Sequence, residues 1–324
     1  MAEWFIEEGI GEHRAVRLDG ERIAAARVAW PGELCAGRVE DAVLVSRAAG
    51  SPRGTARFSG GEEALVDKVP PGAREGAPLR LEVTRPALGE RGRRKLARAR
   101  PTDAPATAAP SLADQLRALG DMVQVVRRFP VGDWAELITE AFGGEVAFAG
   151  GTLQFSATPA MLLIDVDGTL DPRRLALAAV APLADALERF DIGGSIGIDF
   201  PTLAEKAGRR AVDEALAAAL AGWPHERTAM NGFGFVQLVA RLERPSLLHR
   251  ASFQAGGMAA RLLLREAERL EGAGAVELAG HPALQPHLRP EFTAELARRT
   301  GREVRWRAEP ALAPRAPHAQ LVPR

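Results

Sequence analysis

The feature that most constrains the fold is a pair of short apolar segments that each run into an aspartate. The first, Met161-Leu-Leu-Ile-Asp165-Val-Asp167-Gly168, ends in two carboxylates one residue apart. The second, Gly193-Gly-Ser-Ile-Gly-Ile-Asp199-Phe200, carries an aspartate at its carboxyl end. Short apolar runs beside glycine predict buried strands. If the strands are neighbours, Asp165 and Asp199 meet at one sheet edge, where a divalent cation would offset their repulsion.

The segments around this pair alternate strand with helix. Helices are predicted over 112–128, 132–142, 173–189 and 208–222, and strands over 145–149, 152–156 and 235–242. Ser111 is the expected N-cap of the first helix, with Asp114 in its first turn. Such an alternation predicts an α/β sheet with parallel pairing, whose sites lie at the carboxyl ends of the strands.

Composition limits the classes of partner. The net charge is zero, so any site for a polyanion must be a local patch. Cys35 is the only cysteine, which excludes a disulfide framework and a thiolate zinc site and fits a reducing cytoplasm. No apolar run is long enough to span a membrane, and the first residues lack a signal-peptide pattern. A membrane partner is therefore not expected.

The first hundred residues predict small β-structures. Asp19-Gly20 divides residues 14–29 into a β-hairpin. Strands are then expected at 38–46, 54–58, 62–67 and 78–84, and their spacing favours a small barrel. A linker of Pro, Ala and Thr follows at 101–112.

A basic run lies between this barrel and the linker. Residues 85–100 carry seven basic side chains and one acid, among them Arg91, Arg93, Arg94 and Lys95. One interpretation is a patch that follows the phosphates of single-stranded nucleic acid, with Phe58 as a stacking face. The alternatives are a solvated loop for the run and a core position for Phe58.

The last seventy residues predict a compact α/β tail. Its expected elements are helices over 258–271 and 290–299 and strands over 274–278 and 303–307. From Pro310 the chain is rich in proline and alanine, which predicts a loose end over 311–324.

The motif Asp165-Val-Asp167-Gly168-Thr169 resembles the first motif of the haloacid-dehalogenase phosphatases, which implies a nucleophile at Asp165 and a general acid/base at Asp167. That mechanism also needs a later cation and a later acidic motif. No aspartate follows Asp213, and Lys206 is the only lysine after the motif. This phosphatase therefore remains one alternative.

A wider, ordered set of segments resembles the ribonuclease E/G family. The set comprises Trp30-Pro31-Gly32, Arg74-Glu75-Gly76, Glu90-Arg91-Gly92, Gly150–Val166, Asp191–Phe200, Arg209–Val212, Phe233-Gly234, Arg241 and Pro245–Leu247. The resemblance implies a mixed α/β (α+β) fold in which a small OB-fold RNA-binding barrel is inserted in an RNase H-like part. A DNase I-like catalytic subdomain and a small α/β domain follow.

The resemblance also implies where each domain begins and ends. Residues 1–36 are the first strands of the RNase H-like part, 37–100 the barrel, 101–149 the linker and helices that complete that part, 150–250 the DNase I-like subdomain, 255–310 the small domain and 311–324 the tail.

The chain also departs from the family pattern. Asp167, Ala176, Gly232 and Leu65 stand where the family has asparagine, asparagine, arginine and an aromatic residue. Residues 101–164 are too few for the family's 5′-phosphate sensor. The segment 248–257 lacks the cysteines that link protomers through zinc, so no zinc is expected. This argues against a zinc-linked tetramer and leaves a homodimer as one option.

The resemblance implies a magnesium-dependent endoribonuclease that cleaves single-stranded RNA without sensing its 5′ end. Asp165 and Asp199 would hold Mg²⁺, with Mn²⁺ as an alternative, and Asp167 would complete the catalytic set by orienting water or tuning the metal. The expected RNA-binding residues are Phe58, Arg91, Arg93, Arg94, Lys95, Arg209 and Arg210. For each arginine a solvated surface position is the alternative. DNA is not an expected partner. A second hypothesis is a relative that binds RNA but has lost catalysis.

Overall fold

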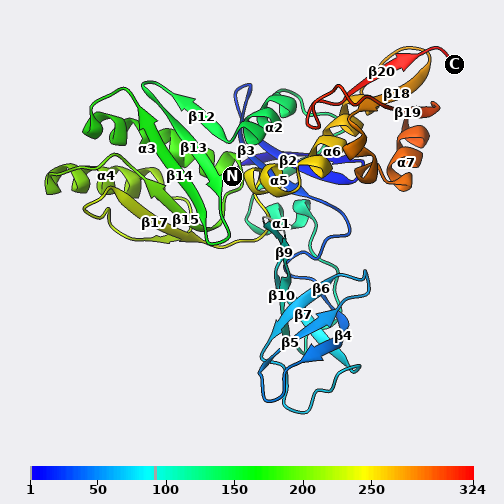
Figure 1. Cartoon of the computed structure of the whole chain (residues 1–324), viewed down its shortest axis with the longest axis horizontal. Helices are drawn as coiled ribbons and strands as arrows, with labels where there is room; N and C mark the ends of the chain where they lie inside the picture. The colour runs from blue at the N-terminus through cyan, green and yellow to red at the C-terminus, as the bar shows by residue number, and fades with distance from the viewer. Residues whose placement is uncertain (1, 91–92) are drawn as a thin grey trace.

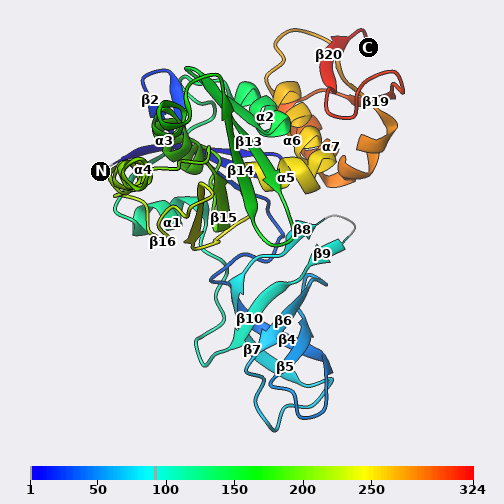
Figure 2. The same ribbon diagram turned by 60° about the vertical axis from the view of Figure 1, so that its left-hand side comes forward.

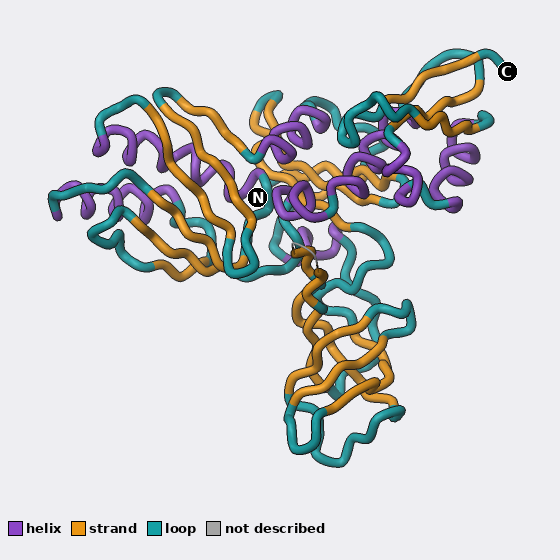
Figure 3. The backbone as a smooth tube through the Cα atoms, in the orientation of Figure 1, coloured by secondary structure: helices purple, strands orange, loops and turns teal. Residues whose placement is uncertain are grey.

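The computed structural model describes residues 2–90 and 93–324. Their strands form a closed barrel and four sheets. Figure 1 shows that the barrel forms a lobe that projects from a body made of the other elements. The helices gather in that body, and the described part of the barrel lobe consists of strands and loops (Figure 3).

A four-stranded sheet forms the centre of the body. Its order is β11-β1-β2-β3, with β1 at Glu3–Gly9, β2 at Glu12–Asp19, β3 at Arg22–Ala29 and β11 at Met122–Val125. The predicted hairpin at Asp19-Gly20 is confirmed by the antiparallel pairing of β2 with β3. Helix α1 (Leu112–Ala118) packs Leu112 and Leu116 against Trp4 and Ile6 on one face of this sheet.

The prediction of one helix over 112–128 is wrong in its second half. Ser111 does cap α1, in a reciprocal capping box with Asp114. The helix ends at Ala118, and Gly120 follows at φ +84°, a conformation that glycine adopts readily. Residues 122–125 then pair in parallel with β1, a long-range partner that helical spacing does not reveal.

The barrel is closed by strands in the order β10-β6-β5-β4-β7. Their bounds are Val39–Arg47 for β4, Arg53–Arg57 for β5, Glu63–Asp67 for β6, Pro78–Arg85 for β7 and Ala97–Pro101 for β10. The four predicted strands are therefore confirmed. Strands β6 and β10 pair in parallel and the other neighbours are antiparallel, which is consistent with an OB-like barrel.

A short hairpin joins the barrel to the body. It consists of β8 (Leu88–Glu90) and β9 (Arg93–Lys95) and packs against helix α5 (Leu247–Phe253). His249 Nε2 lies 2.7 Å from the carbonyl oxygen of Gly89, so the ring nitrogen donates the hydrogen bond. Figure 2 shows this hairpin between the barrel and the body.

The largest sheet has six strands in the order β12-β13-β14-β15-β17-β16. Their bounds are Glu145–Phe148 for β12, Gly151–Ala157 for β13, Leu162–Gly168 for β14, Gly194–Asp199 for β15, His225–Arg227 for β16 and Phe235–Ala240 for β17. Helix α2 (Trp134–Gly143) precedes β12. The predicted parallel pairing is found only between β14 and β15, which a crossover connects. The other neighbouring strands pair antiparallel, because they are joined by hairpins or return in the opposite direction.

Two helices cover one face of this sheet. Helices α3 (Pro172–Arg189) and α4 (Lys206–Ala219) confirm the predicted helices, and α3 packs on β13 and β14. Ile164, Val166 and Ile198 point into the core on this side. Gly168, at the end of β14, pairs with Gly151 beside the β12–β13 turn. Figure 1 places this end of the sheet away from the barrel.

The last part of the chain packs α6 (Ala255–Glu268) and α7 (Pro290–Thr300) on a three-stranded sheet. The sheet order is β19-β18-β20, with β18 at Ala275–Gly280, β19 at Val304–Ala308 and β20 at His318–Val322, and a 3₁₀ helix spans Pro282–His287. The prediction of a loose end over 311–324 is wrong, because β20 pairs antiparallel with β18. Within 2–90 and 93–324, no helix has the length and apolarity needed to cross a bilayer.

Candidate active site

Asp165 and Asp199 are direct partners on neighbouring parallel strands. The register of β14 and β15 places Asp165 opposite Asp199, as the two apolar segments predict. Adjacent strands lie about 4.8 Å apart, so the two carboxylates start from neighbouring Cα atoms. Both side chains are exposed. The structure thus brings together two acids that lie 34 positions apart in the sequence.

The alternation of the strands explains why both acids face solvent. In β14, Ile164 and Val166 are buried against the helices, so Asp165 points to the opposite face of the sheet. In β15, Ile198 is buried in the same way and Asp199 follows it. Within the described residues, neither carboxylate has a hydrogen bond or an ion pair to a protein group. Their oxygen atoms are therefore free to bind a ligand.

Asp167 lies on the same face of β14 but further along the strand. Two residues of a strand span about 6.6 Å, which separates its Cα atom from that of Asp165. Its Oδ1 accepts a hydrogen bond of 2.8 Å from the backbone N–H of Gly168. Among the described residues, no three acidic, histidine or cysteine side chains are grouped as a metal site. The structure therefore groups Asp165 with Asp199 more closely than with Asp167.

An exposed aromatic ring lies at the same end of the sheet. Phe233 is 81% exposed and precedes β17, whose first residue Phe235 pairs with Asp199. The backbone N–H of Phe200 donates to the carbonyl of Gly234, and the hydroxyl of Thr202 donates to the carbonyl of Phe233. The loop that carries Phe233 is thereby joined to the loop that follows Asp199.

Exposed cations stand at the starts of the two covering helices. Arg173 and Arg174 open α3 directly after β14, and Lys206 and Arg210 lie in the first turns of α4. Arg173 and Lys206 have no carboxylate partner among the described residues. Helix N-termini also favour anions. Sequence reasoning missed Arg173, Arg174 and Phe233, although a basic pair just after a strand that ends in acids is a usable signal.

Arg209 and Arg210, the two predicted RNA contacts on α4, have different surroundings. Arg209 Nη1 donates to the carbonyls of Leu203 and Ala204, so this side chain holds the loop between Asp199 and α4. Arg210 is largely exposed and forms an ion pair of 2.9 Å with Glu214 one turn along the helix. Because Arg210 is exposed, it can also contact a ligand, whereas Arg209 holds the loop through its hydrogen bonds.

Phe58 does not offer a stacking face in this structure. Its side chain is 2% exposed and packs in the barrel core with Leu44, Val66 and Leu81. It follows β5 rather than lying on a strand. The core position that the sequence left open as an alternative therefore applies, because a small barrel fills its interior with apolar side chains.

The basic run lies away from the aspartates. Arg94 forms an ion pair of 2.6 Å with Glu62, and Lys95 lies 3.6 Å from Glu90. Arg91 lies outside the described residues, and of Arg93 only the backbone is described, in β9. Figure 1 shows β9 beside the barrel, at the end of the six-stranded sheet opposite to that of Asp199. The structure therefore does not bring this run to the two acids.

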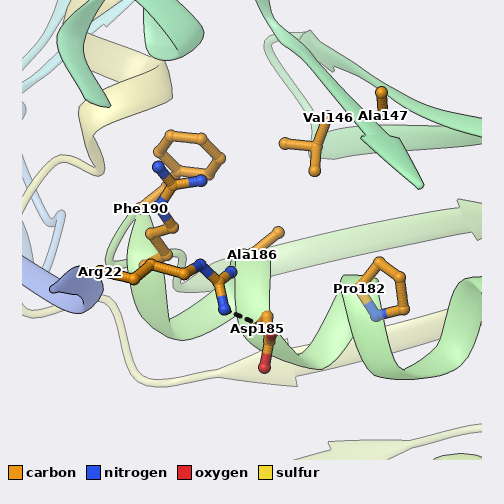
Figure 4. Close-up of a pocket in the computed structure, with 8 residues that line it drawn as sticks. Arg22, Val146, Ala147, Pro182, Asp185, Ala186 and Phe190 are labelled. Atoms are coloured by element: carbon orange, nitrogen blue, oxygen red, sulfur yellow. Dashed lines mark hydrogen bonds and ion pairs between the residues drawn. The ribbon is translucent and has the colours of Figure 1, made fainter. Parts of the chain in front are cut away.

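A small cavity lies elsewhere on the body. It has a volume of about 160 Å³ and lies between β12 and α3, lined by Arg22, Val146, Ala147, Pro182, Asp185, Ala186, Arg189 and Phe190 (Figure 4). Its two arginines already form ion pairs, Arg22 with Asp185 and Arg189 with Glu140. None of the three aspartates of the candidate site lines it.

No protein-family model matches the chain, and no curated protein matches it.

Proposed function

We propose that the protein is a magnesium-dependent endoribonuclease that cleaves single-stranded RNA in the cytoplasm, without sensing the 5′ end. The observation that carries this proposal is the register of β14 and β15, which makes Asp165 and Asp199 neighbours with free carboxylates. Phe233 lies at the same end of the sheet, and exposed cations stand in the first turns of α3 and α4, the helices that follow β14 and β15. Carboxylates for a cation, cations for phosphates and a ring for a base are what such a reaction needs.

Two carboxylates fit the way proteins hold magnesium. Mg²⁺ takes oxygen ligands, commonly from one or two carboxylates together with water and substrate phosphate. Asp165 and Asp199 supply such a pair, and neither is occupied by a protein partner among the described residues. When bound, Mg²⁺ would offset charge on the phosphate and acidify a nearby water. Mn²⁺ suits the same oxygen ligands.

The protein's own residues have distinct roles in this proposal. Asp165 and Asp199 hold the cation, and Asp167 accepts hydrogen bonds from water beside the scissile phosphate. Arg173, Lys206 and Arg210 bind phosphates through exposed side chains on the first turns of α3 and α4. By the resemblance to the ribonuclease E/G family, hydrolysis leaves a 5′-phosphate and a 3′-hydroxyl.

The barrel has the role of an OB-fold RNA-binding domain in this proposal. The four-stranded sheet with β11 corresponds to the RNase H-like part, and the six-stranded sheet with α3 and α4 to the DNase I-like subdomain. The barrel is inserted between β3 and β11, which supports this correspondence. Since Phe58 is buried, binding at the barrel would depend on cations beside it, Arg94 and Lys95 of the β8–β9 hairpin among them.

The test is cleavage of an unstructured RNA in Mg²⁺ by the purified protein. Asp199→Asn and Asp165→Asn should each reduce the rate at least about 100-fold, because a metal site contributes several kcal/mol to the transition state. Asp103→Asn, at an exposed linker position, is the matched control and should cleave like wild type. Equal cleavage by Asp199→Asn and wild type would contradict the proposal.

A second candidate is an RNA-binding protein without catalysis. It is favoured by the absence of a three-acid group among the described residues. In that case wild type binds RNA in a salt-dependent manner and leaves it intact in Mg²⁺. Hydrolysis of a small phosphate ester that needs Asp165 but not Asp199 would instead indicate the haloacid-dehalogenase type of phosphatase.

A further inference from the structure

Phe233 is exposed to an extent that is unusual for a large apolar side chain. It is 81% exposed, the most of any large hydrophobic side chain in the described part of the chain. Its neighbour in the sequence, Phe235, is partly buried on the sheet and covers Gly197. Exposing a phenylalanine forgoes about 2 kcal/mol of burial free energy. The packing of this protein therefore gives Phe233 no stabilising role.

The backbone around Phe233 is nevertheless held firmly. Asn231 Oδ1 accepts hydrogen bonds of 2.9 and 3.0 Å from the backbone N–H groups of Phe233 and Phe235. Gly234 has φ +94°, and a Cβ atom there would lie 2.3 Å from the carbonyl oxygen of Phe200. The loop can therefore take this path only with glycine at 234. An exposed ring on a fixed backbone is a prepared contact surface.

The ring also has a defined position relative to the two acids. In the sheet order β14-β15-β17, Asp199 lies between Asp165 and the strand that Phe233 precedes. Phe233 thus lies on the side of Asp199 that faces away from Asp165. Its carbonyl accepts a hydrogen bond from Thr202, which ties it to the loop after Asp199. A bound polymer that passes over Asp165 and then Asp199 along this edge of the sheet reaches the ring of Phe233 next.

We infer that Phe233 stacks on an unpaired base next to the scissile phosphate, which selects single-stranded RNA at the cut itself. This inference rests on the proposed function and specifies its substrate. A phenyl ring stacks on any base, so this contact gives no base preference. It does require that the base be free of a helix, because a paired base has its faces covered by its neighbours.

The experiment uses oligoribonucleotides in which one 2-aminopurine is moved position by position along an unstructured strand. The full chain is titrated in Ca²⁺ in place of Mg²⁺, and gels verify that the strand stays intact. Stacking on Phe233 should quench the fluorescence at one position. Phe233→Ala should abolish that quench and weaken binding roughly 5- to 30-fold, at the lower end of what a stacked base contributes. Phe233→Trp should retain both.

The control is Val239→Ala, another exposed apolar side chain, on the strand that Phe233 precedes, which should bind and quench like wild type. A quench that persists in Phe233→Ala, a quench at no position, or no binding by wild type would each overturn the inference. Cleavage in Mg²⁺ is measured separately. Loss of the quench in Phe233→Ala supports the stacking contact even if wild type never cleaves, and cleavage without any quench leaves the nuclease proposal standing alone.

Discussion

Asp165, Asp167 and Asp199 carry the same functional group and differ in what the sheet places beside them. Asp165 and Asp199 face each other across neighbouring strands, whereas Asp167 has a backbone hydrogen bond of its own from Gly168. A carboxylate that is not part of the ligand pair can be replaced by an amide of the same shape at small cost. The amide oxygen of asparagine still accepts hydrogen bonds from N–H and water.

Asp167→Asn should therefore retain cleavage of unstructured RNA within about 10-fold of wild type, which corresponds to less than about 1.4 kcal/mol in the transition state. The substitution removes one negative charge from the site, so half-maximal activity should need a higher Mg²⁺ concentration. A magnesium titration of the cleavage rate measures both effects. A loss as large as that of Asp165→Asn would instead make Asp167 a third ligand.

Individual residues also show where sequence reasoning about the site stops. The partnership of Asp165 and Asp199 was predictable because strand pattern and acid position are local properties. Which phenylalanine is exposed was not predictable. Phe58 is buried by strands from the whole barrel, and Phe233 is left outside by a loop whose path depends on Asn231 and Gly234. Both outcomes depend on packing against distant segments, the barrel strands for Phe58 and the Phe200 carbonyl beside Gly234 for Phe233, and a window of neighbouring residues does not encode that packing.

Among the elements, the β8–β9 hairpin fits closely against its partner helix α5. Gly89 packs so tightly on α5 that an added Cβ atom would lie 2.6 Å from the Cβ atom of Phe253, which is fixed to the helix backbone. Gly89→Ala should therefore separate the hairpin from α5 and weaken the His249 hydrogen bond. We expect a loss of about 1–3 kcal/mol in the free energy of unfolding, as for other overpacked contacts.

Chemical denaturation measures that loss, and limited proteolysis should show faster cleavage between barrel and body. The control is Gly60→Ala in a barrel loop, where an added Cβ atom meets nothing within 4 Å. If Gly89→Ala unfolds and is digested like Gly60→Ala, the hairpin contact does not hold the barrel. The comparison isolates steric fit from the general effect of replacing glycine.

The elements that were predictable are those with a complete local sequence pattern. Strands β4, β5, β6 and β7 follow their sequence pattern, because alternating side chains and turn residues lie within each segment. Strands β11 and β20 were missed, because each is short and exists through pairing with β1 or β18. A short stretch of sequence does not reveal hydrogen bonds to distant strands. Short edge strands are therefore mistaken for helix ends or loose tails.

Across the whole molecule, buried ion pairs join parts that are far apart in the sequence. Glu7 of β1 accepts two hydrogen bonds of 2.9 Å from Arg265 of α6, one of 2.7 Å from Arg14 and one of 2.8 Å from the backbone N–H of Phe129. Beside this cluster, Trp30 is stacked between Arg250 and Arg261. The central sheet and the C-terminal helices are thereby tied together through charges that are almost fully buried.

Glu7 makes this junction sensitive to pH. Burial alone would raise the pKa of its carboxyl, but the hydrogen bonds and charges of Arg265 and Arg14 outweigh burial and hold the pKa below the usual 4.5. A depressed pKa contributes stability that is complete above pH 4.5 and is lost as the pH falls toward the folded-state value. Below pH 4.5, protonation of Glu7 should lower the free energy of unfolding of wild type by up to about 1.4 kcal/mol per pH unit.

Glu7→Gln should thus lower the free energy of unfolding at pH 7 by about 3 kcal/mol, because it leaves buried Arg265 without its carboxylate partner and buried Arg14 with Glu12 alone. The variant lacks the titrating group, so the gap to wild type should stay constant down to about pH 4.5 and then narrow. Urea unfolding of both proteins from pH 7 to pH 3.5 measures this gap. Glu8→Gln, the exposed neighbour on β1, should match wild type throughout. A gap that is absent at pH 7, or that does not narrow in acid, would mean that the charge of Glu7 does not hold the two parts together.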